Sequence, residues 1–190
     1  TDGRYIAFDS AANNLVAGDT NEDRDIFIYD SQTGELTTIP QSGVVSPCCA
    51  SLSADGRYVA YAAWVVYVNR LGGPPDPIYV SHIYLHDRTT GETTMVTAET
   101  TSPHYDDESG GPSLSADGRY VAFHSTLDNL VPGDTNDLKD VFVYDRVTGQ
   151  LELVSRHSNG TQGRYGSLKP SISADGRTVV FESYADNLID

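Results

Sequence analysis

Residues 113–123 read SLSADGRYVAF, and close copies of this stretch recur along the whole chain. In each copy a glycine occupies a turn between a short strand-like segment and a run in which apolar residues alternate. The Asp-Gly-Arg core of the copies occurs at residues 2–4, 55–57, 117–119 and 175–177. Spacings of 53, 62 and 58 residues are typical of repeat architectures in which each unit buries its faces against its neighbours.

Two further strand-like segments follow each of the first three copies. In the third copy the first reads DVFVYD at 140–145 and, after a Thr-Gly turn, the second covers 151–155. Four short antiparallel strands per unit form one blade of a β-propeller. The sequence therefore predicts an all-β fold in one domain over residues 1–190. Its blades are expected at about 1–46, 47–108, 109–166 and, incomplete, 167–190.

The elements SADGRYVAF and NLVxGDTNxxxDxFxYD, the latter at 14–30 and 129–145, resemble the TolB-like repeats, a WD-like propeller family. Such repeats are found mostly in bacterial periplasmic, secreted and surface proteins, so the resemblance implies an extracytoplasmic location. It implies no single activity, because these propellers serve as binding platforms, assembly parts and accessory domains of hydrolases.

The repeat register indicates a segment of a larger propeller. A closed propeller usually needs at least about four blades. The chain opens at Thr1 without the first strand of its blade and stops at 187–190, where other copies continue into Gly-Asp-Thr-Asn. An unpaired blade edge is prone to pair with another chain. We therefore expect an oligomer, or part of a larger chain, that associates through its open blade edges.

Acidic residues dominate the charge of the chain. Twelve Lys and Arg against 27 Asp and Glu give a net charge of −15. A field of this sign disfavours nonspecific binding to nucleic acid or to anionic membranes and favours cations as partners. No stretch approaches the roughly 20 apolar residues that span a bilayer. We expect neither nucleic-acid binding nor membrane insertion.

Two acidic loops carry the strongest chemical motif. Calcium takes six to eight oxygen ligands, and alternate residues of a tight loop can direct their side chains to one point. The copy at 134–140 has Leu138 at its fifth position, where a main-chain carbonyl could serve. The motif predicts Ca²⁺ or a similar hard cation with a structural role. The candidate ligands are Asp19, Asn21, Asp23 and Asp25 in the first loop and Asp134, Asn136 and Asp140 in the other.

Ordinary turn chemistry is the alternative for these loops. Asp, Asn, Thr and Gly are turn formers, and Asp and Asn side chains cap their own backbone. The Gly and Glu that an EF-hand carries at positions six and twelve are missing. The sequence leaves both readings open.

Blade two replaces the acidic loop with a long apolar hairpin. Residues 58–69 run into a Gly- and Pro-rich turn at 70–77 and return along 78–82. Aromatic residues on a projecting hairpin are typical of a partner-binding surface, which makes Trp64, Tyr67 and Tyr79 candidates for contact with a protein partner. The alternative is a hairpin that folds back and buries Trp64 and Tyr67 within its own chain.

The two cysteines, Cys48 and Cys49, are adjacent. Neighbouring residues can form only a strained vicinal disulfide. One reading makes one or both of them small buried apolar groups, and the other is a vicinal bridge. Zinc is not expected, because no second Cys or His pair stands at ligand spacing.

A catalytic serine is not expected. No Gly-x-Ser-x-Gly elbow occurs, and Ser53, Ser115 and Ser173 recur in every turn, which indicates a structural role. We expect a non-catalytic, calcium-stabilised propeller module for protein binding or assembly in an extracytoplasmic bacterial protein. The alternatives are an accessory propeller domain of a secreted hydrolase or lyase, and a subunit of a self-assembling fibre or ring.

Overall fold

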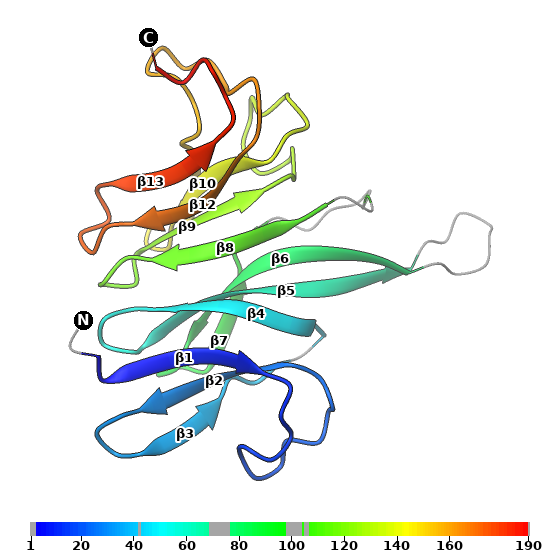
Figure 1. The fold of residues 1–190 in the computed structure, drawn as a ribbon, viewed down its shortest axis with the longest axis vertical. Helices are drawn as coiled ribbons and strands as arrows, with labels where there is room; N and C mark the ends of the chain where they lie inside the picture. Colours follow the sequence, from blue (N-terminus) through cyan, green and yellow to red (C-terminus); the bar gives the residue numbers. More distant parts are fainter. Residues whose placement is uncertain (1–2, 42, 69–76, 98–103, 105–106, 190) are drawn as a thin grey trace.

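The computed structural model describes residues 3–41, 43–68, 77–97, 104 and 107–189. These residues form four antiparallel sheets that stand side by side (Figure 1). They contain no helix that could cross a bilayer. The strands are β1 (Tyr5–Ser10), β2 (Asp25–Asp30), β3 (Glu35–Thr38), β4 (Val45–Leu52), β5 (Tyr58–Val68), β6 (Pro77–Asp87), β7 (Glu92–Met95), β8 (Ser109–Leu114), β9 (Tyr120–Ser125), β10 (Asp140–Asp145), β11 (Gln150–Leu153), β12 (Ser167–Ile172) and β13 (Val179–Ser183).

The sheets are propeller blades, as the repeat pattern predicts. Blade two (β4–β7) and blade three (β8–β11) each contain four strands that pair in sequence order. Blade one contains β1–β3, and blade four contains β12 and β13. Antiparallel pairing with short turns explains the alternation in the sequence, because successive side chains point to opposite faces of each sheet.

Hydrophobic side chains fill the space between neighbouring blades. One cluster joins blades one and two and includes Ile28, Val59 and Tyr61. A second joins blades two and three and includes Ala60 and Phe142. Neighbouring residues such as Val59 and Ala60 thus enter different cores, so both faces of the second strand of a central blade are buried and that strand is largely apolar.

The Ser-Ala-Asp-Gly-Arg turn is closed by its own side chains. In blade three, the Ser115 hydroxyl donates to the Asp117 carboxylate at 2.6 Å and accepts the Tyr120 amide at 2.9 Å. Asp117 also accepts the Arg119 amide at 3.0 Å. These bonds repeat in blades two and four. The recurring serine and aspartate therefore serve the turn.

The tyrosine that follows each of the first three turns joins two blades. The Tyr58 ring lies on Gly118 of the next blade, so that a Cβ placed at Gly118 would stand 2.3 Å from Tyr58 Cδ2. The guanidinium of Arg57 lies 4.8 Å from the ring centroid, and that of Arg146 from blade three lies 4.1 Å from it. Cation–π contacts of this kind contribute about 0.5–2 kcal/mol each.

Arginine of the turn also ties the second strand to the third. Arg57 donates two hydrogen bonds to Asp87 at the end of β6, at 3.0 and 2.7 Å. Arg119 and Asp145 repeat the pair in blade three. In blade one the Arg4 guanidinium lowers the pKa of Asp30 to about 2. A forked guanidinium–carboxylate pair fixes orientation as well as charge.

Substitution of Gly118 by alanine tests the joint between blades. Gly118 has a φ of 70° and faces the Tyr58 ring, whereas Gly149 has a φ of 71° and no heavy atom within 4 Å of a Cβ placed there. Both Gly118→Ala and Gly149→Ala bear the backbone strain of about 1–2 kcal/mol. Only Gly118→Ala adds an overpacking cost of about 1–3 kcal/mol.

The free energy of unfolding in urea measures the difference between the two variants. We expect Gly118→Ala to be the less stable by that overpacking cost. Equal losses in the two variants would show that the tyrosine contact does not hold the blades together.

Candidate cation loops and hairpin at one end of the blades

The segments that differ between blades gather at one end of the molecule. In Figure 1 the β1–β2 connection, the last residues of β5, the first residues of β6 and the β9–β10 connection all lie toward the right. The Asp-Gly-Arg turns lie at the opposite end, where the sequence repeats. The differences in sequence between blades are therefore concentrated at the right-hand end, which carries both acidic loops and the hairpin.

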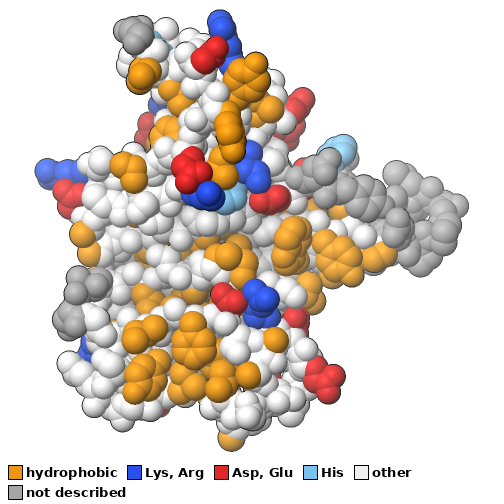
Figure 2. Space-filling view, in the orientation of Figure 1, with side chains coloured by type: hydrophobic (Ala, Val, Ile, Leu, Met, Phe, Trp, Pro, Cys, Tyr) orange, Lys and Arg blue, Asp and Glu red, His pale blue; other side chains and the backbone are white. Residues whose placement is uncertain are grey.

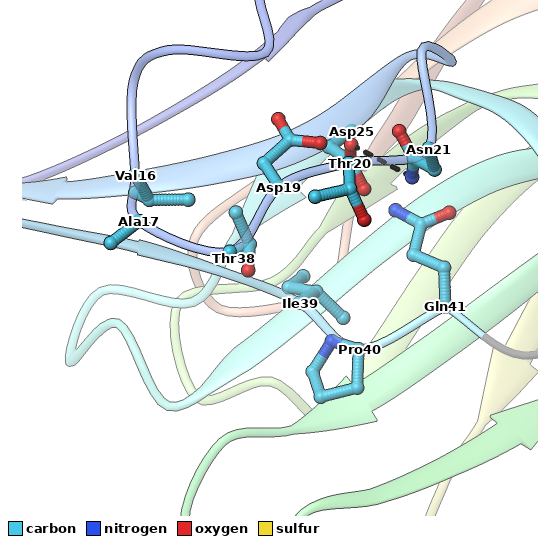
Figure 3. Close-up of a pocket in the computed structure, with 11 residues that line it drawn as sticks. Val16, Ala17, Asp19, Thr20, Asn21, Asp25, Thr38, Ile39, Pro40 and Gln41 are labelled. Atoms are coloured by element: carbon cyan, nitrogen blue, oxygen red, sulfur yellow. Dashed lines mark hydrogen bonds between the residues drawn. The ribbon is translucent and has the colours of Figure 1, made fainter.

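The first acidic loop encloses a cavity of about 250 Å³. Asp19, Asn21 and Asp25, three of the predicted ligands, line it together with Thr20 and Gln41 (Figure 3). The Asn21 amide donates to Asp25 Oδ2 at 3.1 Å. Burial raises the pKa of Asp25, and the charges of Asp19 and Asp23 add to the shift. Negative charge is thus concentrated beside the cavity.

Asp23, the fourth predicted ligand, is not among the residues that line this cavity. Its carboxylate accepts the amide and the hydroxyl of Ser46 at 2.9 and 3.0 Å. These bonds and the Arg24 amide lower the pKa of Asp23. Asn21 Oδ1 accepts the Asp23 amide at 3.0 Å, which is the self-capping turn of the alternative reading. Asp23 therefore links blade one to β4 of blade two.

The other acidic loop holds a fully buried carboxylate. Asp140 is 0% exposed, and its Oδ1 accepts the Ser155 hydroxyl at 2.5 Å. Among the described residues, no donor meets its buried Oδ2 at hydrogen-bond distance, although the nearby Asn136 side chain favours the charged form of this carboxylate. Burial raises the pKa of Asp140 and also that of Asp134, on which the Asp140 charge acts in the same direction. An unpartnered buried carboxylate oxygen costs free energy unless a donor or a cation meets it.

The remaining loop residues are held by the segment between blades three and four. Gln162 donates to Asp134 Oδ1 at 3.0 Å. Asn136 donates to the Gly163 carbonyl at 3.3 Å, and its Oδ1 accepts the Leu138 amide at 3.1 Å. The amide oxygens of both predicted asparagines are thus used in their own turns, and Asp134 and Asp140 each accept a side-chain hydrogen bond at Oδ1.

Blade two places a histidine where blades one and three have the buried aspartate. His82 aligns with Asp140, and its partner Thr97 aligns with Ser155. The two ring nitrogens of His82 lie 2.8 Å from Thr97 Oγ1 and 3.2 Å from the Tyr67 hydroxyl. A histidine with a hydrogen-bond partner at each ring nitrogen therefore occupies this position in the blade that lacks an acidic loop.

The hairpin β5–β6 extends beyond the other strands (Figure 1). Val66 and Tyr79 lie opposite each other and are exposed, whereas Trp64 is half-buried. Apolar side chains are visible on this part of the surface (Figure 2). Tyr67 contacts its own chain through His82. Tyr79 is therefore exposed, as expected of a partner-binding surface, whereas Tyr67 contacts its own chain, as the alternative predicted. The predicted turn at 70–77 lies, except for Pro77, outside the described residues.

The cysteines lie in β4, where Cys48 packs against the core and Cys49 is exposed. Both are free thiols. Among the described residues, no group of three or more His, Cys, Asp and Glu side chains converges to hold a metal. Any cation at the acidic loops would therefore take part of its shell from backbone, amide or hydroxyl oxygens.

Sequence reasoning missed the residues that close the loops from the following segment. Gln41, Ser155 and Gln162 come after the last strand of their blades, about 15 to 30 residues beyond the aspartates they approach. The one available signal was the alignment of Thr97 with Ser155 after the last strand.

The four sheets and their side-by-side arrangement have the architecture of β-propeller blades. Putative TolB from Agrobacterium tumefaciens matches with a TM-score of 0.60 at 21% identity, over 100% of this chain and 53% of its own. Oligogalacturonate lyase from Vibrio parahaemolyticus matches with a TM-score of 0.56 at 16% identity, over 97% and 43%. The tricorn protease matches with a TM-score of 0.55 at 17% identity, over 95% and 14%.

These similarities show the fold alone, and the chain spans about half or less of each of these proteins. No protein-family model and no curated protein sequence matches the chain.

The pKa of Asp140 predicts a pH dependence of stability in the presence of a chelator. A raised pKa means that the folded state binds the proton more readily than the unfolded state. The Asp140 contribution to stability therefore rises as the pH falls from neutral toward the ordinary value of 3.8. Urea unfolding at a series of pH values should show this rise in the wild type and lose it in Asp140→Asn.

The control for this titration is Asp137→Asn, an exposed residue of the same loop with a φ of 52° that Asn tolerates. It should follow the wild type. A difference between wild type and Asp140→Asn that stays constant with pH would contradict a raised pKa at Asp140.

Proposed function

We propose that this chain is a non-catalytic, calcium-stabilised propeller module that binds or assembles with protein in an extracytoplasmic bacterial protein. The observation that carries the cation is the unpartnered Oδ2 of Asp140 at full burial. Blade two, which has no acidic loop, carries His82 at the aligned position, and both ring nitrogens of His82 have hydrogen-bond partners. This difference supports a cation at Asp140. The extracytoplasmic location rests on the TolB-like resemblance and on the acidity of the chain.

Calcium suits the oxygens that these loops offer. Asp134 and Asp140 would supply two carboxylates in blade three, and Asp19 and Asp25 would supply two in blade one. Main-chain carbonyls and water complete the shells of many protein calcium sites. Ionised carboxylates are costly to bury, and a bound cation would neutralise their charge. It would also stabilise the loops by mass action.

The binding role rests on the end of the molecule that varies. The exposed pair Val66 and Tyr79 on the projecting hairpin offers an apolar contact surface. The serines of the three described Ser-Ala-Asp-Gly-Arg turns donate to the turn aspartates and accept backbone amides. They are therefore engaged in structure, which supports a non-catalytic module.

Assembly rests on two apolar end faces. Ile6 in blade one is 50% exposed, although the aligned Val59 and Val121 are fully buried by the preceding blades. Val180 in blade four is 62% exposed, although the aligned Ala122 is fully buried by the neighbouring blades. We propose that these two faces cover each other between copies of the chain, head to tail.

An accessory propeller of a secreted hydrolase or lyase is the second candidate. The fold similarity to oligogalacturonate lyase and to the tricorn protease favours it. Incubation with oligogalacturonate, followed by the ultraviolet absorbance of unsaturated products, distinguishes the two. The non-catalytic module gives no product, and turnover by the purified chain would replace the first proposal with the second.

Thermal and urea unfolding with calcium and with chelator tests the cation proposal. At a calcium concentration 100 times the dissociation constant, one site adds about 2.7 kcal/mol to the free energy of unfolding. Asp140→Asn should lose the part of this calcium-dependent stabilisation that comes from the loop of blade three, while Asp137→Asn should keep it. An equal calcium response in wild type and Asp140→Asn would return this loop to ordinary turn chemistry.

Light scattering over a range of concentrations tests assembly through the end faces. We expect wild type to form species larger than a monomer, and Val180→Glu to dissociate them because a charge would be buried in the contact. Val147→Glu, at an exposed residue of the Thr-Gly turn, is the matched control and should assemble normally. A wild type that stays monomeric throughout would contradict the proposal.

A further inference from the structure

The cysteine pair lies at a backbone position that the fold imposes in three blades. The first strands β4, β8 and β12 each contain a bulge in their pairing with the second strand. The bulge residue is left-handed in all three, with φ of 62° at Cys49, 58° at Gly111 and 52° at Lys169. Blade two thus has a cysteine at a position where glycine is the least strained choice.

The surroundings of this position differ in blade two. A Cβ at Gly111 would stand 3.0 Å from the ring of His124, and Lys169 pairs with Glu182 at 3.1 Å. The second-strand residue that aligns with His124 and Glu182 is Ala62, which is opposite Cys48. Because the alanine side chain is short, the two sulfur atoms have room in this region of the bulge.

The two thiols are in contact and are differently exposed. Their Sγ atoms lie 2.6 Å apart. Cys48 is half-buried against the core, whereas Cys49 is exposed and donates its amide to Asp9 Oδ1 at 3.4 Å. Arg24 of the first acidic loop pairs with the other oxygen of Asp9 at 3.0 Å. A guanidinium and a carboxylate thus both act on Cys49.

The environment separates the acidities of the two sulfurs. Hydrogen bonding from Cys48, assisted by the Arg24 charge, lowers the pKa of Cys49 to about 7, against the opposing effects of burial and of Asp9. The same contact, with burial, raises the pKa of Cys48. An exposed thiolate next to a protonated thiol is the arrangement of an attacking and a resolving cysteine.

We infer that Cys48 and Cys49 form a thiol–disulfide exchange site that takes small disulfides as co-substrates, with Cys49 as the attacking and Cys48 as the resolving residue. The Cys49 thiolate attacks one sulfur of RS–SR, forms a mixed disulfide and expels RS⁻, which takes a proton. Cys48 then loses its proton to solvent and attacks Cys49 Sγ, which expels the second RS⁻.

The overall reaction oxidises two protein thiols to a vicinal disulfide and reduces RS–SR to two RSH. A bridge between adjacent residues is strained, and strained bridges are the reducible ones. The oxidation is therefore reversible by excess thiol.

Oxidised glutathione and mass spectrometry of the intact protein test this site. Wild type should lose the mass of two hydrogen atoms and show no lasting glutathione adduct. Cys48→Ala should stop at one glutathione per chain, and Cys49→Ala should react far more slowly because Cys48 is half-buried and protonated. Phenylarsine oxide, which bridges neighbouring thiols, should bind the wild type alone.

The pH dependence of iodoacetamide alkylation assigns the attacking residue. The rate at Cys49 should have its midpoint near pH 7 in wild type and a higher midpoint in Cys48→Ala, where the hydrogen bond is removed. Cys48→Ser keeps a donor hydroxyl and should retain most of the lowered midpoint, which also controls for folding. A persistent glutathione adduct on wild type, or equal midpoints in wild type and Cys48→Ala, would overturn the proposal.

Discussion

The contact of a tyrosine ring with the glycine of the next blade is the constraint on which this structure depends. Tyr58 can lie on Gly118 because that position has no side chain, and the guanidiniums of Arg57 and Arg146 cover the ring. Arg146 also donates to the Gly118 carbonyl at 3.1 Å. The Asp-Gly-Arg-Tyr elements at 55–58 and 117–120 therefore close their own turns and position the next blade.

This joint fixes one end of the blades and leaves the other end free to vary. The same buried position near the variable end is filled by Asp25, His82 and Asp140 in successive blades. His82 has a partner for each ring nitrogen. Asp25 has an amide partner beside a polar cavity, and Asp140 retains a buried oxygen without one. An aspartate thus occupies this position in the two blades that carry an acidic loop, and a histidine occupies it in the blade without one.

The strands were predictable because their alternation and turns are local properties of the chain. The segments 25–30 and 140–145 are the observed β2 and β10, and the recurring serines have the structural role that the sequence predicts. The inward direction of Tyr67, the contact of Asp23 with Ser46 and the approach of Gln162 to Asp134 depend on neighbouring segments. The spacing of residues within one loop does not contain that information.

Hydrogen exchange resolved by peptide, with and without calcium, tests most directly whether the variable end is a set of cation loops on a fixed propeller. The account predicts that calcium slows exchange in residues 19–25 and 134–140 and leaves exchange in the β6 segment around His82 unchanged. Exchange that is unaffected by calcium in both loops, or slowed equally in all blades, would contradict it.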